Sequence, residues 1–470
     1  MPRQAVVLGQ AFAIDFQQPR AAVHDMTRTE QPHTLDALVI GAGGSGLAAA
    51  KAMHARGLAF DCVERGSAVG GLWRYDNDNG MSAIYRSLQI NTSRDMTAFA
   101  DYPMPDDYPD FPRHEQIRDY LESYVDHFGF RDRIRFRTTV ETVVPQADGT
   151  FVVSMRAADG VMLARRYRSI LVASGHHWLP RLPNLPGTFA GQMLHAHDYR
   201  SPEEFAGKRV LVVGMGNSGC DIACDLARVA ADTLLSTRRG AHVIPKYLFG
   251  IPLDTVCPEA IWRFAPMWLF RPAFATVVWL NRGTLGLYGL PRPSHKVLQE
   301  HPTISSDLPS LVRERRVVIK PDIERLDGDG VRFADGSREP VDTMILATGY
   351  KIVFPFLDAG IISPEENEVR LYRNVVHPTL PGLYFLGLIQ PWGAIFPLAE
   401  AQAEWVGDLI EGRCQLPAHD AMERAIDADI ARIRRRYVKS PRHTIQVDFH
   451  AYRAAVRRER RRGRRQQARA

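Results

Sequence analysis

Three glycines stand at a spacing suited to binding a phosphate group. Gly41, Gly43 and Gly46 form the pattern G-x-G-x-x-G between a short apolar run at 35–40 and an alanine-rich helical stretch. The first glycine permits a tight turn, the second lets the backbone approach a pyrophosphate, and the third lets the helix pack closely against the strand. Backbone amides at the start of such a helix bind phosphate oxygens. The segment therefore predicts a dinucleotide site.

An acidic residue completes this first site. Glu64 ends the next expected strand, close to the usual distance of about 20 residues after the glycines. A carboxylate at that place accepts hydrogen bonds from the hydroxyl groups of an unphosphorylated ribose. The glycine pattern alone is weakly specific, and a purely structural glycine turn is the alternative. Strand, helix and acid together favour an adenosine ribose without a 2′-phosphate.

The glycine pattern recurs at Gly214, Gly216 and Gly219, again between an apolar run and a helical stretch. At the end of the following strand, Arg238 and Arg239 stand where the first unit has its acid. Guanidinium groups bind a 2′-phosphate bidentately, whereas a carboxylate would repel it. The second nucleotide is therefore predicted to be NADPH rather than NADH. The alternative is that both arginines merely cap a strand on a solvated face.

Two dinucleotide sites in one chain suggest that the two bound cofactors react with each other. FAD at the first site and NADPH at the second can do so, because hydride can pass from the nicotinamide to the flavin. The predicted fold is α/β, with two Rossmann-like dinucleotide-binding domains and the NADPH domain inserted into a discontinuous FAD domain. The predicted parts are an irregular N-terminal extension (1–33), the first FAD part (34–185), the NADPH domain (186–334), the second FAD part (335–452) and a basic tail (453–470).

The charge distribution argues against a nucleic-acid reader. The formal net charge is +6, but residues 453–470 contain nine Arg and one Glu, or +8, so the rest of the chain carries about −2. A basic groove for phosphates is thus not indicated in the body of the protein. The Arg-rich run is predicted to be a solvated, partly disordered tail, and a nucleic-acid, membrane-surface or partner contact is its alternative.

The cysteines indicate a reducing compartment. The five cysteines are scattered and contain no C-x-x-C pair, which favours the cytoplasm and excludes a redox disulfide between flavin and substrate. Cys220 and Cys224 share a helix face and are predicted to be buried and structural. No H-E-x-x-H motif or Cys/His cluster indicates a metal site.

No segment reads as a secretory signal or an uninterrupted membrane span. Residues of about 248–291 are nevertheless unusually apolar and aromatic, with breaks at Pro266 and Pro272. We predict that this insertion roofs a substrate channel or packs as core. A peripheral membrane contact is the alternative that we do not favour, and a homodimer stays open.

Further segments resemble the flavin-containing monooxygenase family, the class B flavoprotein monooxygenases, over nearly all of residues 34–452. The most specific is 189–200, where Phe189, Gly191, His195, Tyr199 and Arg200 match F-x-G-x-x-x-H-x-x-x-[YF]-[KR]. The family has Pro or Asp four residues later, where this chain has Glu204. The other matching segments are 70–75, 91–94, 346–350, 387–405 and 440–449.

This resemblance implies an activity like that of N,N-dimethylaniline monooxygenase. NADPH would reduce FAD, and O2 would add to form a C4a-hydroperoxyflavin whose distal oxygen is attacked by a soft nitrogen or sulfur nucleophile. The protein would exclude water and hold NADP⁺ against the intermediate. Baeyer–Villiger enzymes carry Trp where this chain has Tyr199-Arg200, so amine or sulfide oxygenation is preferred. Ketone oxygenation and an NADPH oxidase that releases H2O2 are the alternatives.

The resemblance also implies roles for individual residues. Asn91 is expected beside the flavin peroxide, where its amide can donate and accept hydrogen bonds. Asn217 and Ser218 lie in the second glycine turn, with Asn217 expected toward the nicotinamide. The residues expected near FAD are Gly71, Trp73, Arg74 and Gln390.

Overall fold

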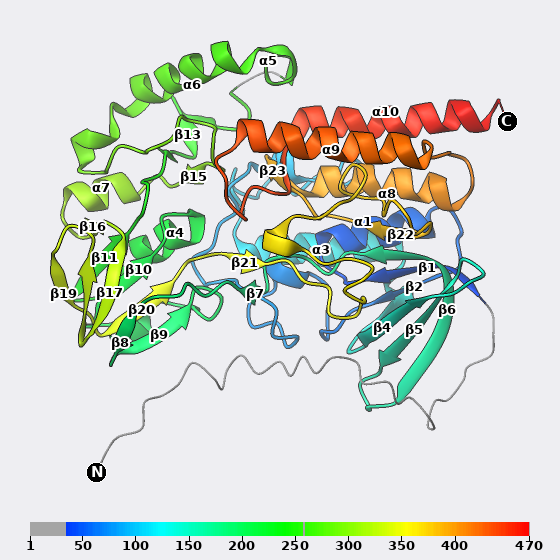
Figure 1. The fold of residues 1–470 in the computed structure, drawn as a ribbon, viewed down its shortest axis with the longest axis horizontal. Helices are drawn as coiled ribbons and strands as arrows, with labels where there is room; N and C mark the ends of the chain where they lie inside the picture. Colours follow the sequence, from blue (N-terminus) through cyan, green and yellow to red (C-terminus); the bar gives the residue numbers. More distant parts are fainter. Residues whose placement is uncertain (1–33, 257–258, 470) are drawn as a thin grey trace.

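The computed structural model describes residues 34–256 and 259–469, so the predicted extension 1–33 lies outside the described residues. Two sheets with parallel cores stand next to each other, the first on the right of Figure 1 and the second on the left. Each contains one of the two predicted glycine turns directly after its central strand. The predicted α/β architecture with two dinucleotide-binding domains is confirmed.

The first sheet has the strand order β3-β2-β1-β6-β5-β4, and β22 pairs with β6. β1 pairs in parallel with β2 and β6, and its residues from Ala37 to Ile40 are buried, as expected for a short apolar strand covered on both faces. Its strands are β1 (Leu35–Ile40), β2 (Phe60–Val63), β3 (Ile134–Arg135), β4 (Thr139–Pro145), β5 (Phe151–Arg156), β6 (Met162–Val172) and β22 (Leu383–Phe385).

Helices from both ends of the chain cover this sheet. Leu47 and Ala48 of α1 share a buried cluster with Ala403 and Trp405 of α8, so residues more than 350 positions apart form one core. The helices of this part are α1 (Gly44–His54), α2 (Arg94–Thr97), α3 (His114–Phe128), α8 (Phe396–Ile410), α9 (His419–Arg436) and α10 (Phe449–Gln467).

The second sheet has the order β16-β11-β10-β20-β9. Its strands are β9 (Gln192–His195), β10 (Arg209–Val213), β11 (Asp232–Ser236), β16 (Val318–Lys320) and β20 (Thr343–Leu346). α4 (Asn217–Leu226) and α7 (Leu308–Arg313) pack on it, and a smaller sheet adjoins it, formed by β8 (Gly187–Phe189), β17 (Ile323–Gly328), β18 (Gly330–Phe333) and β19 (Arg338–Pro340).

The predicted return to the FAD domain at residue 335 is wrong. β20 pairs in parallel with both β10 and β9, so the NADPH part continues through Leu346. The chain returns to the FAD part only after that strand, where β21 (Tyr350–Lys351) pairs with β7 (Leu179–Pro180). A four-residue buried strand is apolar in either sheet, so its pattern does not reveal which sheet it joins.

Short two-stranded ladders lie outside the main sheets, each within one part of the chain. They are β12 (Val243–Ile244) with β15 (Thr303–Ile304), β13 (Tyr247–Leu248) with β14 (Ile251–Pro252), and β23 (Gln390–Trp392) with β24 (Gln446–Asp448). The 3-10 helices are Gly71–Trp73, Arg131–Arg133, Glu203–Phe205, Leu285–Tyr288 and Glu365–Asn367.

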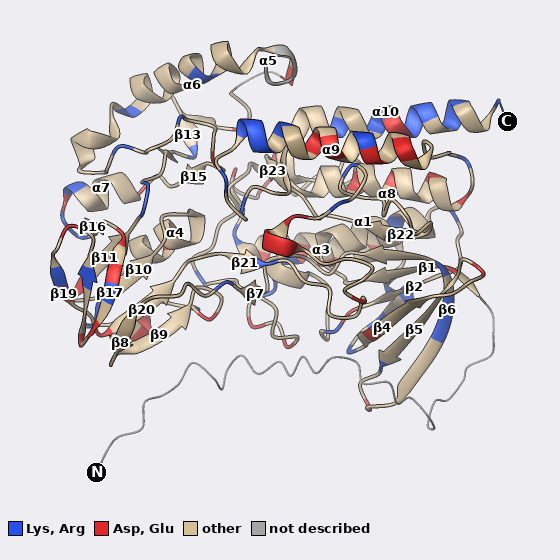
Figure 2. Cartoon of the chain, viewed as in Figure 1, with Lys and Arg blue, Asp and Glu red and all other residues tan. Residues whose placement is uncertain are grey.

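The prediction of a partly disordered basic tail is also wrong. Residues 449–467 form the continuous helix α10, which lies along α8 and carries most of the positive charge in that region (Figures 1 and 2). Arg460 Nε and Arg464 Nε lie 2.5 and 2.6 Å from Oδ2 of Asp408, whose side chain is fully buried. Although burial opposes ionisation, these hydrogen bonds hold the pKa of Asp408 well below its usual range.

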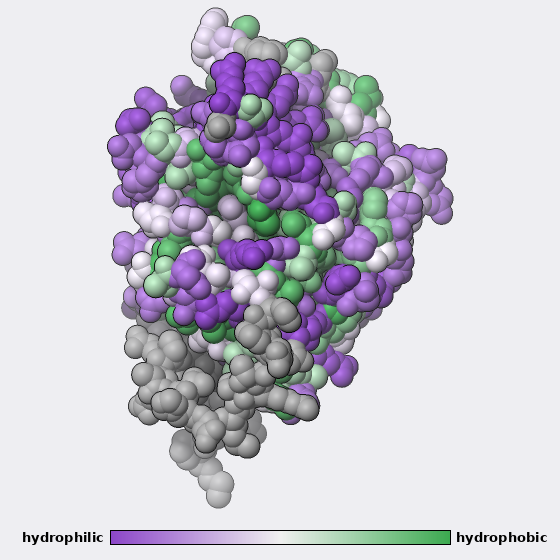
Figure 3. Space-filling model, turned by 90° about the vertical axis from the view of Figure 1, so that its right-hand side faces the viewer, coloured by the Kyte–Doolittle hydropathy of each residue, from purple (hydrophilic) through white to green (hydrophobic). Residues whose placement is uncertain are grey.

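The opposite face of α10 stays solvated. Hydrophilic residues cover the upper part of the side shown in Figure 3, where the helix ends. The arginines of the run therefore divide into a face that pairs with α8 and a face that meets water, as the i, i+4 spacing of a helix allows. The exposed arginines include Arg457, Arg458, Arg461 and Arg465.

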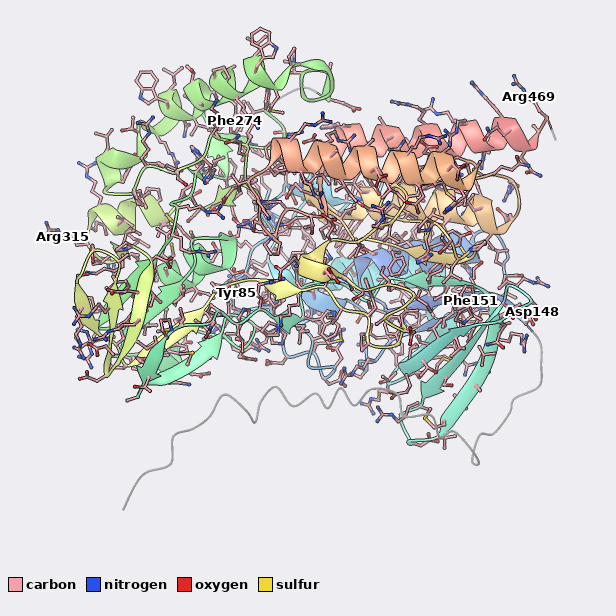
Figure 4. All side chains as sticks on the ribbon, viewed as in Figure 1. Tyr85, Asp148, Phe151, Phe274, Arg315 and Arg469 are labelled. Carbon is pink, nitrogen blue, oxygen red and sulfur yellow. The ribbon has the colours of Figure 1, made fainter. Side chains whose placement is uncertain are left out.

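The apolar insertion packs as core only in part, at Leu248, Phe270 and Leu290. α6 (Met267–Arg282) follows α5 (Glu259–Phe264) and exposes 77% of Trp268, 54% of Trp279 and 61% of Leu280. Phe274 of α6, which is labelled in Figure 4, lines the main cavity, so part of the insertion does roof it. Within the described ranges, no helix is both long and apolar enough to cross a membrane.

Candidate functional site

One cavity of about 1300 Å³ lies between the two sheets and is lined by both glycine turns. Ligand pockets for one small molecule span about 300–1,000 Å³, so this volume suits more than one ligand. Tyr85, labelled near the middle of Figure 4, lies where the two parts meet. The topology thus brings two sites that are far apart in sequence into one cleft.

The first glycine turn is closed to any larger side chain. Gly41 has φ +103°, and a Cβ on it would lie 2.7 Å from the carbonyl oxygen of Ala173 at the end of β6. A Cβ on Gly46 would lie 1.8 Å from the carbonyl oxygen of Gly41. Gly43 instead faces Gly71 across the cavity wall, where its added Cβ would be 3.6 Å from the Gly71 Cα atom. This geometry fits a bound pyrophosphate, as the glycine pattern predicts.

Glu64 supports the same turn. Its side chain is 5% exposed, and Oε2 accepts a hydrogen bond of 2.8 Å from the backbone N–H of Ala42. Oε1 accepts hydrogen bonds from the Gly66 N–H at 2.7 Å and the Asn79 amide at 3.1 Å. The carboxylate also lines the cavity. It therefore fixes the turn, and ribose binding by this carboxylate stays a prediction.

The second glycine turn has nearly the same backbone geometry as the first. Gly214 has φ +110°, and its Cβ would lie 2.6 Å from the carbonyl oxygen of Ala347, at the end of β20. A Cβ on Gly219 would lie 1.9 Å from the carbonyl oxygen of Gly214. Ser218 lines the cavity beside this turn. The chain therefore has two built phosphate-binding turns.

Asn217 has a structural contact besides its predicted place in the site. Its Oδ1 accepts a hydrogen bond of 2.7 Å from the backbone N–H of Ile304, and the Thr303 hydroxyl donates to the Met215 carbonyl at 3.1 Å. These bonds tie β15 to the turn. Asn217 still lines the cavity, so a nicotinamide contact through its amide nitrogen stays a prediction.

The two arginines predicted at the 2′-phosphate differ in their surroundings. Both line the cavity, but Arg238 is exposed and Arg239 forms an ion pair of 3.3 Å with Glu300. Arg238 therefore has the more accessible guanidinium group for a phosphate. Because Glu300 already compensates Arg239, we assign the larger share of 2′-phosphate binding to Arg238 as a prediction.

Asn91 lies on the cavity wall, in the loop before α2. Within the described part of the chain, its side-chain amide makes no hydrogen bond. The loop itself is fixed from the other domain, because Oδ2 of Asp254 accepts a 2.7 Å hydrogen bond from the Ser93 N–H and Lys246 Nζ lies 3.3 Å from the Ile90 carbonyl. The amide of Asn91 is thus positioned by its backbone and available to a ligand.

Sequence reasoning missed Asp254 and Lys246. Both lie in or beside the β13–β14 hairpin of the insertion, which reaches from the NADPH part to the loop carrying Asn91. No motif marks them. A lysine and an aspartate bracketing a tight turn, Phe249-Gly250, are the only sequence signal, and it does not indicate a partner.

The structure separates the four residues predicted near FAD. Gly71, Trp73 and Gln390 line the cavity. Arg74 does not, because its guanidinium pairs with Glu122 of α3 and its Nε donates to the Val69 carbonyl at 3.1 Å. A place of Arg74 near FAD stays a prediction. Its neighbour Trp73 faces the cavity from a 3-10 turn, which directs consecutive side chains differently.

The fingerprint at 189–200 lies at the junction of the two parts, and its residues His195 and Ala196 line the cavity. Tyr199 is fully buried, and its hydroxyl lies 3.4 Å from Oδ2 of Asp225. Arg200 donates to the backbone carbonyls of His197 at 2.6 Å and Ser82 at 3.2 Å. The bond from Arg200 to Ser82 links the NADPH part to the FAD part, whereas Tyr199 and Asp225 both belong to the NADPH part.

A buried carboxylate also links the two parts of the chain. Asp221 of α4 accepts a 2.6 Å hydrogen bond from the Tyr85 hydroxyl of the FAD part. Burial raises the pKa of Asp221 to about 6, against the opposing influence of Tyr85 and Lys246. Ser87 likewise bonds to Asp225 one helical turn later. Sequence reasoning missed both acids because acids on an α-helix usually face solvent.

The other predictions for this region concern metals and thiols. Within residues 34–256 and 259–469, no group of three or more His, Cys, Asp or Glu side chains could hold a metal ion. Cys220 and Cys224 are buried, as predicted, and burial raises the pKa of Cys224 to about 12. Neither thiol is set up for redox chemistry.

Comparison with known proteins agrees with this geometry. The family model "Flavin-binding monooxygenase-like" matches residues 36–459. Flavin-containing monooxygenase 5 of Oryctolagus cuniculus is 39% identical over 428 residues, covering 87% of this chain and 80% of the relative. Flavin-containing monooxygenase 2 of Homo sapiens is 34% identical over 440 residues, covering 88% and 80%.

Solved structures share the fold. The S-allyl-L-cysteine S-oxygenase from Allium sativum has a TM-score of 0.68 and 25% identity, covering 93% of both chains. A closed cyclohexanone monooxygenase has a TM-score of 0.69 and 19% identity, covering 93% of this chain and 99% of its own. The latter identity supports the fold alone. The two glycine turns, the shared cavity and the family match establish that the chain belongs to the flavin-binding monooxygenase family and is an FAD-dependent monooxygenase that uses FAD and NADPH.

Proposed function

We propose that this enzyme uses NADPH and O2 to oxygenate a small, soft nitrogen or sulfur nucleophile such as a tertiary amine or a sulfide. The observation that carries this proposal is the place of Asn91. Its uncommitted amide lines the cavity that contains both glycine turns, in a loop held from the opposite domain. The sulfur substrate in the name of the Allium sativum enzyme supports the same reaction class.

Each part of the chain has a defined role in this reaction. The first turn, with Glu64, would hold FAD, and the second turn, with Arg238 and Arg239, would hold NADPH. When bound and reduced, FAD supplies the activated oxygen. Asn91 would donate and accept hydrogen bonds at the reacting end of the cofactor. No acid–base pair is required, because a soft heteroatom attacks with its own lone pair.

Exclusion of water is the second role of the protein. The roof includes Phe274 and Leu253, and Trp73 and Trp392 contribute aromatic surface to the walls. An apolar enclosure slows the loss of activated oxygen to H2O2. The Tyr85–Asp221 bond and the fingerprint residues keep this enclosure closed by joining the two domains.

The test measures coupling. Purified FAD-loaded enzyme is mixed with NADPH in aerated buffer, and NADPH consumption, H2O2 release and product are followed with dimethylaniline, methyl phenyl sulfide and cyclohexanone. We expect amine or sulfide oxide formed in near one-to-one ratio with NADPH. Exclusive lactone formation from cyclohexanone would instead make this a ketone oxygenase. Stoichiometric H2O2 with every substrate would make it an NADPH oxidase.

Two variants of Asn91 test whether its amide couples NADPH consumption to substrate oxygenation. Asn91→Ala and Asn91→Asp should accept electrons from NADPH at a normal rate yet release most of the oxygen as H2O2. The loss of one preorganised donor typically costs about 10²–10³-fold in the step it supports. A matched control is Thr92→Val on the same loop, whose hydroxyl contacts Thr97 at 2.8 Å. Unchanged coupling in both Asn91 variants would contradict the role.

A further inference from the structure

Arg442 lies over the second glycine turn although it belongs to the far end of the chain. If Gly216 carried a Cβ atom, that atom would lie 3.4 Å from Nη1 of Arg442 and 3.8 Å from its Cζ and Nη2. Gly216 is the glycine whose missing side chain lets the backbone approach a pyrophosphate. The guanidinium group therefore stands on the side of the turn from which the phosphates of a dinucleotide approach.

This guanidinium has no partner in the part of the chain that the structure describes. Its backbone N–H bonds to Ser440 Oγ at 3.3 Å, but no hydrogen bond or ion pair involves its side chain. Burial lowers the pKa of Arg442, and Glu300 opposes this only through its longer-range charge. Glu300 itself is paired with Arg239. Arg442 is partly exposed and lines the cavity, so its guanidinium group is available to an anion that binds there.

The segment that carries Arg442 is firmly attached to the FAD part. Residues 446–448 form β24, which pairs with β23 beside the cavity, and the Gln390 N–H donates to the Ile445 carbonyl at 2.8 Å. His443 Nδ1 lies 3.0 Å from the Val438 carbonyl. The same segment also bonds to the NADPH part, because the His301 N–H donates to His443 Nε2 at 3.3 Å. Arg442 therefore lies at the junction of the two parts, beside the NADPH turn.

Among the described residues, no charged atom lies within 4 Å of a Cβ built on the corresponding glycine of the first turn. There the corresponding glycine, Gly43, faces the backbone of Gly71, which brings no charge. Two turns of the same geometry therefore differ in the charge placed opposite the phosphates. A guanidinium group binds two phosphate oxygens at once and stays charged at any physiological pH.

We propose that Arg442 binds the pyrophosphate of NADPH and completes the second nucleotide site from the FAD domain. The inference rests on the proposed assignment of NADPH to the second turn. It adds a third arginine with a separate role. Arg238 and Arg239 recognise the 2′-phosphate, whereas Arg442 recognises the pyrophosphate from the junction of the two parts.

The test compares two ligands in the FAD-loaded enzyme by isothermal titration calorimetry, without turnover. NADP⁺ contains both phosphate groups, and adenosine 2′-monophosphate contains only the 2′-phosphate. Arg442→Met should weaken NADP⁺ binding by roughly 10–100-fold, the range for hydrogen bonds to charged groups, and leave adenosine 2′-monophosphate within about twofold. Arg442→Lys should recover part of the loss, since it keeps the charge but not the bidentate geometry.

Arg238→Met is the matched control, because it should weaken both ligands. If Arg442→Met weakened neither ligand while Arg238→Met weakened both, the pyrophosphate role would be overturned and the NADPH assignment would stand. If Arg442→Met weakened both equally, Arg442 would be a 2′-phosphate ligand instead. If no variant changed either affinity, the assignment of NADPH to the second turn would itself fail. FAD content and the thermal midpoint of each variant verify that it is folded.

Discussion

The two glycine turns have nearly the same backbone and different chemistry around it. In both, the first glycine lies against a carbonyl oxygen from the end of a neighbouring strand, that of Ala173 in one turn and Ala347 in the other. In the first turn the nearby charge is the carboxylate of Glu64; in the second it is arginine. The backbone thus provides a general phosphate site, and the side chains around it determine which nucleotide binds.

The helices after the turns differ in the same way. Ala48 and Ala52 of α1 are fully buried in the core of the FAD part. The matching positions of α4 carry Asp221 and Asp225, which accept hydrogen bonds from Tyr85 and Ser87 across the domain boundary. Helix α1 thus packs inside its own domain, whereas α4 forms hydrogen bonds with the other domain. A repeated motif therefore acquires separate roles through the residues that face its neighbours.

The largest effects are expected from replacing the third glycine of either turn, and they should differ between the two turns. Gly46→Ala would place a Cβ 1.8 Å from a carbonyl oxygen, and Gly219→Ala would place one at 1.9 Å. Each clash should cost about 3 kcal/mol or more, the upper range for overpacking. Gly46→Ala should lose FAD and fold poorly, while Gly219→Ala should keep FAD and lose NADP⁺ binding. Flavin absorbance per protein and NADP⁺ calorimetry measure both; loss of FAD in both variants would contradict independent sites.

A smaller effect is expected at the acid of the first turn. Glu64→Gln keeps the shape but removes the charge that accepts the Ala42 and Gly66 N–H groups. Hydrogen bonds to a charged group contribute about 1.5–3 kcal/mol, so FAD should bind about 10–100-fold more weakly. Once this variant is saturated with added FAD, its affinity for NADP⁺ should equal that of the wild type. The quenching of flavin fluorescence on titration gives the dissociation constant, and an unaltered value would show that Glu64 does not serve the flavin site.

The exposed arginine of the second turn should govern the choice of nucleotide. Arg238→Ser removes one phosphate ligand while Arg239 stays paired with Glu300. We expect kcat/KM for NADPH to fall about tenfold, or roughly 1.4 kcal/mol, with little change for NADH. Steady-state kinetics with both nucleotides measure the ratio. An equal loss for the two would assign Arg238 a role other than 2′-phosphate recognition.

The last prediction concerns how stability depends on pH at Asp221, where the two parts of the chain meet. The pKa of Asp221 is raised to about 6 in the folded protein, so the folded state holds a proton that the unfolded chain has already released. Its stabilising contribution is complete below about pH 4 and is lost as pH rises through about 6. Asp221→Asn cannot ionise, so its stability relative to wild type should improve by about 2–3 kcal/mol from pH 4 to pH 7.

Thermal midpoints at several pH values measure this difference. Tyr85→Phe offers an internal check, because removing the hydroxyl that bonds to Asp221 raises the carboxyl pKa further and moves the transition to higher pH. A difference between Asp221→Asn and wild type that stays constant with pH would show that Asp221 does not titrate in this window.

Local patterns predicted much of the fold. Glycine spacing, apolar strands and the acid or arginine after each second strand are encoded within about 30 residues, which is why both turns and their likeness to the family could be inferred. The boundary at 335 could not, because β20 is four apolar residues that either sheet could accept. The pairing of Arg74 with Glu122 of α3 could not be inferred either, because the two residues are 48 positions apart.

The sequence by itself determined the two phosphate-binding turns, the family and the pair of cofactors, because these depend on short segments with strict backbone requirements. The tertiary structure alone decided that the basic C-terminal run is a packed helix, since Asp408 lies 52 and 56 residues before the two arginines that bind it. It also brought Asp254 to the Asn91 loop and Arg442 to the NADPH turn. Such contacts join residues that no local pattern connects, and burial sets their energies.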